Sequence, residues 1–392
     1  MLRIAIVANT PPPYRVPIFQ RLGQVPGIRF HVIFCSRREP NRHWDLPPFD
    51  FSHTFLPERH FAVRDRYVHN NPEVFGALKR FGPQVVVTDG FNPSHLYAFA
   101  YTLAYGVPHI PMTDGTYESE QALSPVHRAV RRLVYARSGA FVSASIGGDR
   151  LYQSYGIPPA LCFKSCLCID NDSFTPSGPV PEKRFDFVFC GRIEPGKSPL
   201  FALDVAVETA RRLGRPVSLL FVGSGSQEES VRQAAARHDG LVQAEFHGFA
   251  AQGELPGLYR SARIFLFPTL ADVWGVVANE ACAAGLPVLV SPYAGANGEL
   301  LRDGENSFIC PLDAGLWAER AVRLLEQPAL QEAFSARSLE LVRQYTFDNA
   351  AQGLLDACHA ALAVRPGRPA PFPRAASPIA RAKAGKREAE NS

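Results

Sequence analysis

Two basic residues near the end of an apolar run could bind a diphosphate. The stretch CGRIEPGKSPL, residues 190–200, places Arg192 and Lys197 five positions apart. Two cations on a strand-to-helix turn can bind diphosphate oxygens without a metal ion. The eight letters from Gly191 also fit G-x-x-x-x-G-K-S, the phosphate loop of nucleotide hydrolases, although Pro195 removes a backbone N–H that such a loop uses. Two solvated surface cations are a third interpretation.

Two carboxylates follow in FPTLADVWGVVANEACAAGLPVLVSP, residues 267–292. Asp272 and Glu280 stand eight positions apart, and Gly275 is expected to begin a helix between them. The free N–H groups at a helix start favour an anion, and carboxylates accept hydrogen bonds from the hydroxyls of a polyhydroxylated ligand. The alternative makes Asp272 an N-cap and Glu280 a surface acid.

A glycine turn lies between these two segments. FVGSGSQEES contains Gly223 and Gly225 but no third glycine at the dinucleotide spacing, so it supports a Rossmann cofactor site only weakly. A turn approached by a nucleotide and a plain strand-to-helix turn both remain open.

The elements that must position these residues form an alternating pattern. Continuous apolar runs separated by helical patterns indicate parallel sheets covered by helices on both faces. We therefore expect an α/β protein with two doubly wound domains and a cleft between them, in which ligands lie beyond the carboxyl ends of the strands. The expected strands are Arg3–Asn9, Phe30–Ser36, Val85–Asp89, His109–Thr113, Ala140–Ser145, Phe185–Cys190, Ser218–Val222, Ala244–Gly248, Ile264–Pro268, Pro287–Ser291 and Ser307–Pro311. The expected parts are an N-terminal domain 1–170, a linker 171–183, a C-terminal domain 184–364 and a disordered basic tail 365–392.

Charge and composition narrow the function classes. The chain has 46% hydrophobic and 20% charged residues, and of its net charge of +4 the tail carries +5, which leaves the body near −1. A nearly neutral body argues against a nucleic-acid partner. No apolar run approaches the roughly 18 residues of a membrane span, and the N-terminus does not look like a signal peptide. The expected location is the cytoplasm.

Three motifs in this order resemble a known family. GRIEPGK, the spacing D-x7-E and the segment GLPVLVSPYAGANGELLRDGENSFICPLD resemble the retaining, nucleotide-sugar-dependent glycosyltransferases of family GT4 over roughly 185–364. The resemblance implies the GT-B fold, with two Rossmann-like domains facing a central cleft. It implies transfer of a sugar from a UDP- or GDP-sugar to a glycan or lipid-linked acceptor, in polysaccharide or glycolipid synthesis. We expect no cofactor and no metal, because Arg192 and Lys197 already supply positive charge.

The resemblance also implies residue roles in the second half of the chain. Arg192 and Lys197 would bind the donor diphosphate, and Glu280 would hold the ribose hydroxyls. Asp272 stands where the family usually has Glu, so it reaches about 1.5 Å less. The other residues implied at the donor are Gly191, Gly223, the Trp274, Gly275 and Val276 backbone beside the sugar, and Glu299 on the nucleotide side.

The first half of the chain resembles the family less. Asp114, in PMTDGTYESE, stands where family members often have a cleft His, and we assign it a catalytic position on that basis. Tyr14 and Arg15, in NTPPPYRVP, are candidates for acceptor or phosphate contact. The alternative is that PPPYR only stiffens a loop.

A basic amphipathic segment, SPVHRAVRRLVYARS, follows Asp114. Its arginines stand beside Val130, Leu133 and Val134, which predicts a peripheral contact with an anionic membrane face. A solvated helix face is the alternative. The arginines are Arg128, Arg131, Arg132 and Arg137.

Other functions stay open at this stage. Asp170-Asn171-Asp172 is a D-x-D that holds manganese in another glycosyltransferase fold, but it falls in the expected linker, so we assign no metal ligands. The rival functions are a non-catalytic nucleotide-sugar-binding protein, a sugar-nucleotide epimerase and, with less support, a P-loop ATPase.

Overall fold

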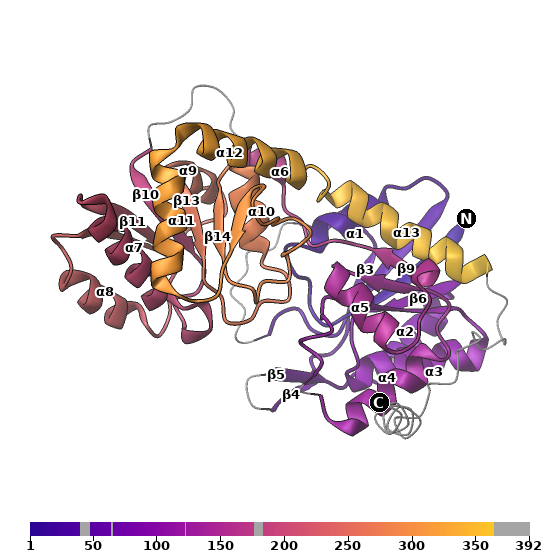
Figure 1. Cartoon of the computed structure of the whole chain (residues 1–392). Coiled ribbons are helices and arrows are strands. Elements are labelled where there is room, and N and C mark those ends of the chain that lie inside the picture. The colour runs from indigo at the N-terminus through magenta and orange to yellow at the C-terminus, as the bar shows by residue number, and fades with distance from the viewer. Residues whose placement is uncertain (40–47, 64–65, 122, 176–182, 364–392) are drawn as a thin grey trace, which may run out of the picture. The chain divides into compact units, whose positions relative to one another are not determined.

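The computed structural model describes residues 1–39, 48–63, 66–121, 123–175 and 183–363. The chain divides into two compact units (Figure 1). Of the described residues, the first unit contains those of Met1–Ser143 and Gly147–Lys164 together with residues 353–363, and the second contains those of Ala144–Ile146 and Ser165–Gln352. Residues 353–363 thus cluster with the first unit, although the expected domain boundary places them in the second. The expected basic tail lies outside the described residues.

The first unit is built on a seven-stranded parallel sheet of order β3-β2-β1-β6-β7-β8-β9. Its strands are apolar and buried over most of their length, as expected where helices cover both faces. A separate antiparallel hairpin joins β4 to β5. The bounds are β1 (Leu2–Ala8), β2 (Ile28–Phe34), β3 (His53–Phe55), β4 (His60–Val63), β5 (Arg66–His69), β6 (Val85–Thr88), β7 (His109–Thr113), β8 (Phe141–Ser143) and β9 (Cys162–Lys164).

Helices pack on this sheet through alternate strand residues. Helix α1 contacts one face, where Phe19 packs against Phe30 and Phe34 of β2. Helices α2 and α3 cover the residues that point the other way, among them Val7 and Ile33. The helices are α1 (Val16–Gly23), α2 (Glu73–Phe81), α3 (Pro93–Tyr105), α4 (Pro125–Tyr135), α5 (Ile146–Ser154), the 3-10 turn η1 (Pro159–Leu161) and α13 (Phe347–Ala363), which begins in the second unit.

The second unit is built on a six-stranded parallel sheet of order β12-β11-β10-β13-β14-β15. In sequence rank this is 3-2-1-4-5-6, the order of dinucleotide-binding sheets, and its direction reverses between β10 and β13. Ligands of such sheets bind beyond the carboxyl ends of the strands at this reversal. The bounds are β10 (Phe185–Cys190), β11 (Val217–Val222), β12 (Val242–Gly248), β13 (Ala262–Phe267), β14 (Val288–Val290) and β15 (Ser307–Ile309).

Two groups of helices enclose the second sheet. Helices α7, α8 and α11 share a core with the strand side chains of Phe187, Leu219 and Ile264. The alternate residue Phe265 contacts Tyr259 of α9, which itself contacts α6 and α10. The helices are α6 (Asn171–Phe174), the 3-10 turn η2 (Pro195–Lys197), α7 (Pro199–Leu213), α8 (Glu228–Ala236), α9 (Leu255–Arg260), α10 (Val276–Ala283), α11 (Ala314–Glu326) and α12 (Pro328–Val342).

The predicted fold class is confirmed: both units are Rossmann-like, with parallel sheets, and every expected strand is present. The short strands β3 and β9 and the β4–β5 hairpin were not expected. Residues 171–174, expected to lie in a linker, form α6 instead, and residues 176–182 lie outside the described residues.

Candidate functional site

The loops after β10 and β13 meet at the reversal point of the second sheet. The backbone N–H of Leu270 donates to the carbonyl of Gly196 over 2.9 Å, and the Thr269 hydroxyl donates to the same oxygen over 3.3 Å. These bonds join the turn that carries Lys197 to the loop that leads into α10. Segments 73 residues apart in the sequence therefore form one site.

The loop after β10 does not have the conformation of a phosphate loop. The N–H groups of Ile193, Lys197 and Ser198 already donate to backbone carbonyls, over 2.9, 2.9 and 3.1 Å. A phosphate loop needs these N–H groups free to surround the anion. The hydrolase alternative is therefore wrong at this position, and the side chains of the loop remain as candidates.

A second loop supports this one through a glycine contact. Gly223 follows β11 with a φ of +127°, and a Cβ there would lie 2.0 Å from the carbonyl oxygen of Gly191. Only glycine permits this approach. Ser226 then donates to the Glu194 carboxylate from its N–H over 2.8 Å and from its hydroxyl over 2.5 Å. Gly191 and Gly223 thus lie together and fix the Arg192 turn; their role in binding a nucleotide stays a prediction.

The two predicted cations differ in their surroundings. Arg192 is exposed, and its guanidinium has no hydrogen-bond or ion-pair partner within the part of the chain that the structure describes. The Lys197 ammonium lies 2.5 Å from Oδ2 of Asp272, and the side chains of both residues are mostly shielded, with 23% and 18% exposed. Arg192 is thus open to a ligand, whereas Lys197 shares its charge with a carboxylate.

Asp272 makes two contacts inside the site. Besides the ion pair with Lys197, its Oδ1 accepts a hydrogen bond from the backbone N–H of Trp274 over 3.2 Å. It is not the N-cap of α10, because Gly275 occupies that position. The structure thus shows Asp272 linking the Lys197 turn to the start of α10, while its predicted contact with a donor sugar stays a prediction.

This ion pair gives a prediction for Asp272→Asn. Removing the carboxylate charge frees Lys197, so we expect a nucleoside diphosphate to bind about tenfold more tightly, equivalent to about 1.4 kcal/mol. Titration calorimetry with UDP and with GDP would measure it. Asp239→Asn, which removes an exposed carboxylate before β12, is the matched control and should leave the affinity unchanged. Weaker binding by Asp272→Asn would contradict the competition.

The start of α10 offers two open backbone donors. The N–H groups of Gly275 and Val276 have no acceptor among the described residues, and the positive end of the helix dipole lies here. Gly275 has a φ of +91°, and a Cβ would lie 2.4 Å from the ring of Phe267. The Trp274 side chain is instead part of the core, where its indole donates to Asn279 over 2.7 Å. Of the three backbone positions that we predicted, only Gly275 and Val276 thus keep an open N–H.

Glu280 is buried beneath this helix start. Only 7% of it is exposed, so the surface-acid alternative is wrong. The Tyr259 hydroxyl donates to Oε2 over 2.7 Å, and Oε1 has no partner among the described residues. Burial raises the pKa of Glu280 to about 7, and the bond from Tyr259 opposes that rise. One oxygen is therefore fixed, and the other is poorly solvated and available.

Glu280 also lies next to the end of β10. Burial of the Cys190 thiol raises its pKa, the charge of Glu280 raises it further, and Tyr259 bonds to both side chains. Cys190 directly precedes Gly191, so Glu280 lies at the same reversal point as the Arg192 turn. Sequence reasoning missed Tyr259, whose only signal is its place 21 residues before Glu280 on the helix before β13. Glu299 is buried in the segment after β14, and its role stays a prediction.

In the first unit, two predicted residues form an ion pair. The guanidinium of Arg15 bonds to the carboxylate of Asp114, and Arg15 is buried while Asp114 is about one-third exposed. The Arg15 side chain thus does not face solvent. It holds the Asp114 carboxylate at the carboxyl end of β7. Tyr14 is half-buried beside it. Catalytic and acceptor roles for these residues stay predictions.

Another polar group at this edge was missed. His95 is buried in the first turn of α3, and its Nε2 lies 2.9 Å from Oδ1 of Asp89 at the end of β6. Nearby, the Asn92 amide donates to Oδ1 of Asn9 over 2.9 Å. The signal was VTDGFNPSH, in which polar residues directly follow a buried strand. These side chains mark the reversal point between β1 and β6 in the first sheet.

The D-x-D triplet is engaged in local structure. Asp170 accepts a hydrogen bond from Ser173 over 2.6 Å, and the Asn171 amide donates to the carbonyls of Val342 and Tyr345 over 3.0 and 3.1 Å. Among the described residues, no group of three or more His, Cys, Asp or Glu side chains could hold a metal.

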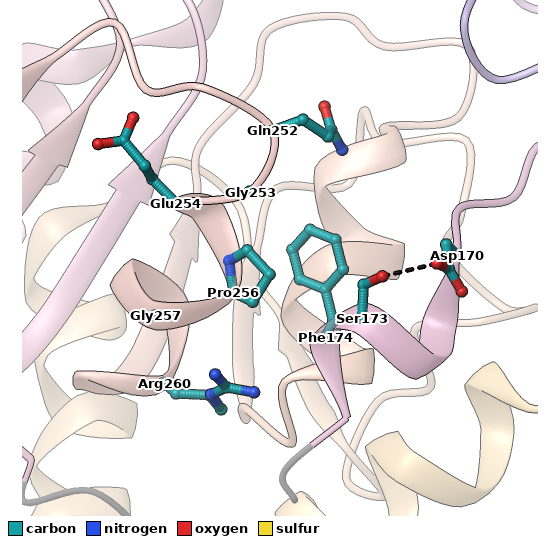
Figure 2. A pocket seen from close by; sticks show the side chains of 9 residues that line it. All are labelled: Asp170, Ser173, Phe174, Gln252, Gly253, Glu254, Pro256, Gly257 and Arg260. Carbon is teal, nitrogen blue, oxygen red and sulfur yellow. Dashed lines mark hydrogen bonds between the residues drawn. The ribbon is translucent and has the colours of Figure 1, made fainter. Parts of the chain in front are cut away.

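A pocket of about 670 Å³ lies between α6 and α9 in the second unit (Figure 2). It contains none of the predicted site residues. Figure 2 shows the hydrogen bond between Ser173 and Asp170 at its wall. The pocket is lined by Asp170, Ser173, Phe174, Gln252, Gly253, Glu254, Pro256, Gly257 and Arg260.

The second unit carries the match to a protein family. Residues 170–340 match the model of the glycosyl transferases group 1, and this range falls within the second unit. It contains the Arg192 turn, Asp272 and Glu280. Residues 170–340 are thus similar to the group 1 glycosyl transferases. The resemblance drawn from the motifs is confirmed at the level of the family.

The alignments with curated glycosyltransferases cover different lengths of the chain. It is 31% identical over 171 residues to a phosphatidyl-myo-inositol mannosyltransferase of Mycobacterium leprae, covering 43% of this chain and 44% of that protein. It is 29% identical over 391 residues to a D-inositol 3-phosphate glycosyltransferase of a Nocardioides species, covering 85% of each. In most of these matches the chain spans about half the length of the relative or less.

Solved structures show the same fold. The crystal structure of Anabaena Alr3699/HepE in complex with UDP has a TM-score of 0.72 and 14% identity, and the match covers 92% of this chain and all of that one. The lipopolysaccharide outer core galactosyltransferase WaaB matches with a TM-score of 0.67 and 13% identity over 92% of this chain. These similarities confirm the fold of the chain, with its two Rossmann-like units. Among the described residues, no helix has the length and apolar character needed to span a membrane.

Proposed function

We propose that the chain transfers a sugar from a UDP- or GDP-sugar to a glycan or lipid-linked acceptor, with retention of the anomeric configuration and without a metal. The observation that carries this proposal is the group of residues at the β10–β13 reversal point. It combines three groups that have no partner among the described residues: the Arg192 guanidinium, the N–H groups at the start of α10 and Oε1 of Glu280. The relatives named as glycosyltransferases, and the structural neighbour solved with UDP, support the same reading.

Each part of the group fits one part of a nucleotide sugar. Arg192 and Lys197 supply positive charge for a diphosphate, and the N–H groups of Gly275 and Val276 supply neutral donors beside it. The free oxygen of Glu280 suits a ribose hydroxyl, because a poorly solvated carboxylate gains most from a new hydrogen bond. The donor would then cross the carboxyl ends of β10 and β13.

The reaction needs charge stabilisation at the leaving group. Cleavage of the bond between the anomeric carbon and the phosphate oxygen leaves negative charge on the diphosphate, which Arg192, Lys197 and the α10 dipole stabilise. We propose that the acceptor hydroxyl attacks from the same face and passes its proton to the leaving phosphate oxygen. A covalent intermediate would need a carboxylate opposite the leaving group. Asp272 does not suit that role, because it is bound to Lys197 and to the Trp274 backbone.

The predicted surroundings of the enzyme follow from its acceptor. A lipid-linked acceptor would place the enzyme at the cytoplasmic face of a membrane, in contact with anionic lipid. This location stays a prediction, as does a role in cell-surface polysaccharide or glycolipid synthesis.

A panel of nucleotide sugars in EDTA tests the function. We expect either the UDP-sugars or the GDP-sugars to raise the melting temperature, and one of them to donate its sugar to a glycan or lipid acceptor at an unchanged rate in EDTA, because the site supplies its own cations. A strict requirement for manganese would contradict the metal-independent site. Stabilisation by ATP and magnesium alone would favour an ATPase. Binding of a nucleotide sugar without turnover would favour a non-catalytic sensor. Rearrangement of the donor without an acceptor would favour an epimerase.

A further inference from the structure

Helix α4 of the first unit, labelled in Figure 1, buries two residues of one face. Val134 and Tyr135 are buried in the core with Phe141 of β8. Arg131 lies over the ring of Phe91 at 4.3 Å and pairs with Glu120 over 2.7 Å. These contacts fix the helix on the unit without using its opposite face.

The outer face of α4 carries a second apolar stripe. Val126 is 71% exposed and Leu133 is 59% exposed, although aliphatic side chains of this size are usually buried. Exposed Ala129 and half-buried Val130 lie between them, so the four positions follow the i, i+3, i+4, i+7 spacing of one helix face. Nothing among the described residues covers this stripe.

Arginines flank the stripe, and acidic residues are missing from it. Arg128, Arg132 and Arg137 are exposed, and the sequence contains no Asp or Glu from Gln121 to Gly148. Arg128 donates to the carbonyl of Gln121 over 2.6 Å, and its charge also acts on the Glu120 carboxylate, whose salt-bridge partner is Arg131. Among the acids just before the helix, Glu120 is paired with Arg131, and Glu118 is exposed in the preceding turn.

We propose that this outer face, made of Val126, Ala129, Leu133 and the flanking Arg128, Arg132 and Arg137, docks the first unit on an anionic lipid surface. Charge complementarity decides the occupant: guanidinium groups bind lipid phosphates in pairs of hydrogen bonds, and a narrow apolar stripe between them enters the boundary between headgroups and acyl chains. The helix lies in the plane of the surface. The proposal stands on α4 and on Arg137 just after it, so it does not depend on the donor site.

Vesicle binding by the full chain tests the proposal. We expect the wild type to sediment with vesicles of phosphatidylcholine and phosphatidylglycerol, but not with phosphatidylcholine alone, and to dissociate as salt is added. Arg128→Gln/Arg132→Gln should weaken this binding at least tenfold, since each arginine near the surface contributes about fivefold. Val126→Ser/Leu133→Ser should also weaken it about tenfold. All four side chains are exposed, and melting temperatures within about 2 °C of the wild type would show intact folding.

A matched control separates this face from general charge effects. Arg211→Gln/Arg212→Gln removes the same charge from the exposed end of α7 in the second unit and should leave vesicle binding unchanged. An equal loss in this control, or equal binding to neutral vesicles, would overturn the proposal. So would a wild type that ignores vesicles but forms a dimer sensitive to Val126→Ser/Leu133→Ser, because a second copy would then cover the face.

Discussion

Arg192→Ala is expected to lower the rate of sugar transfer by about 10²–10³-fold, the usual effect of removing one preorganised group that stabilises developing negative charge. The effect should be large because the Arg192 guanidinium has no hydrogen-bond or ion-pair partner among the described residues and is exposed, so it can bind the diphosphate directly. Lys197→Ala should act in the same direction but less strongly on binding, since Asp272 already neutralises part of its charge. Initial rates at saturating acceptor would measure both.

The structure offers controls for this experiment. Arg192→Lys keeps the charge but loses the paired donors of the guanidinium, so it should recover part of the rate. Arg211→Ala removes an exposed arginine from α7 in the same unit and should leave the rate unchanged. Full turnover by both Arg192→Ala and Lys197→Ala would remove the diphosphate contact from the account.

Glu280→Gln is expected to weaken nucleotide binding by about 10²-fold at pH 8. A charge-assisted hydrogen bond is worth about 1.5–3 kcal/mol, and the ribose offers two hydroxyls to the carboxylate. Gln keeps the size of the side chain and can still accept the bond from Tyr259, so the fold should survive. Calorimetry with UDP and GDP would measure the change, and an unchanged affinity would exclude Glu280 from the site.

The pH dependence of binding gives the same residue a distinct signature. In the free protein the pKa of Glu280 is raised to about 7 by burial, whereas hydroxyls donating to it favour the ionised form. Nucleotide affinity should therefore fall as the pH drops below 7, by up to tenfold per unit, and Glu280→Gln should remove this dependence on pH. A wild-type affinity that is flat from pH 8 to 5.5 would contradict this role.

The folding stability should change with pH in the opposite direction to the nucleotide affinity. The folded pKa lies above the unfolded value of about 4.5, so the contribution of Glu280 to stability is complete below pH 4.5 and is lost as the pH rises through 7. The cost at pH 8 is on the order of 3 kcal/mol. Because the buried Glu280 carboxylate lowers the folding stability at pH 8, we infer that it serves ligand binding and does not serve folding.

The sequence predicted the elements better than the contacts. Continuous apolar runs predicted the central strands, because strands covered on both faces need such runs. The strands β3 and β9 have only three residues each, too short for a pattern, and α6 begins with Asn and Asp, which also suit a linker. Local composition could not separate these cases.

The sequence predicted which residues form the candidate site, but it did not predict the contacts between them. The motifs placed Arg192, Lys197, Asp272 and Glu280 in one site, but the bond between Lys197 and Asp272 depends on β10 and β13 being neighbours in the sheet. The support of Glu280 by Tyr259 depends on how α9 packs against α10. Such contacts depend on strand order and helix packing, which residue spacing does not encode.

The central claim is that Arg192 and the start of α10 bind the second phosphate of a nucleotide, and a comparison of two ligands tests it most directly. The affinities of a nucleoside diphosphate and of the matching monophosphate are measured by calorimetry in EDTA, for the wild type and for Arg192→Ala. We predict that the wild type binds the diphosphate at least tenfold more tightly and that Arg192→Ala loses most of this preference. Equal affinities of the wild type for the two ligands would contradict the account.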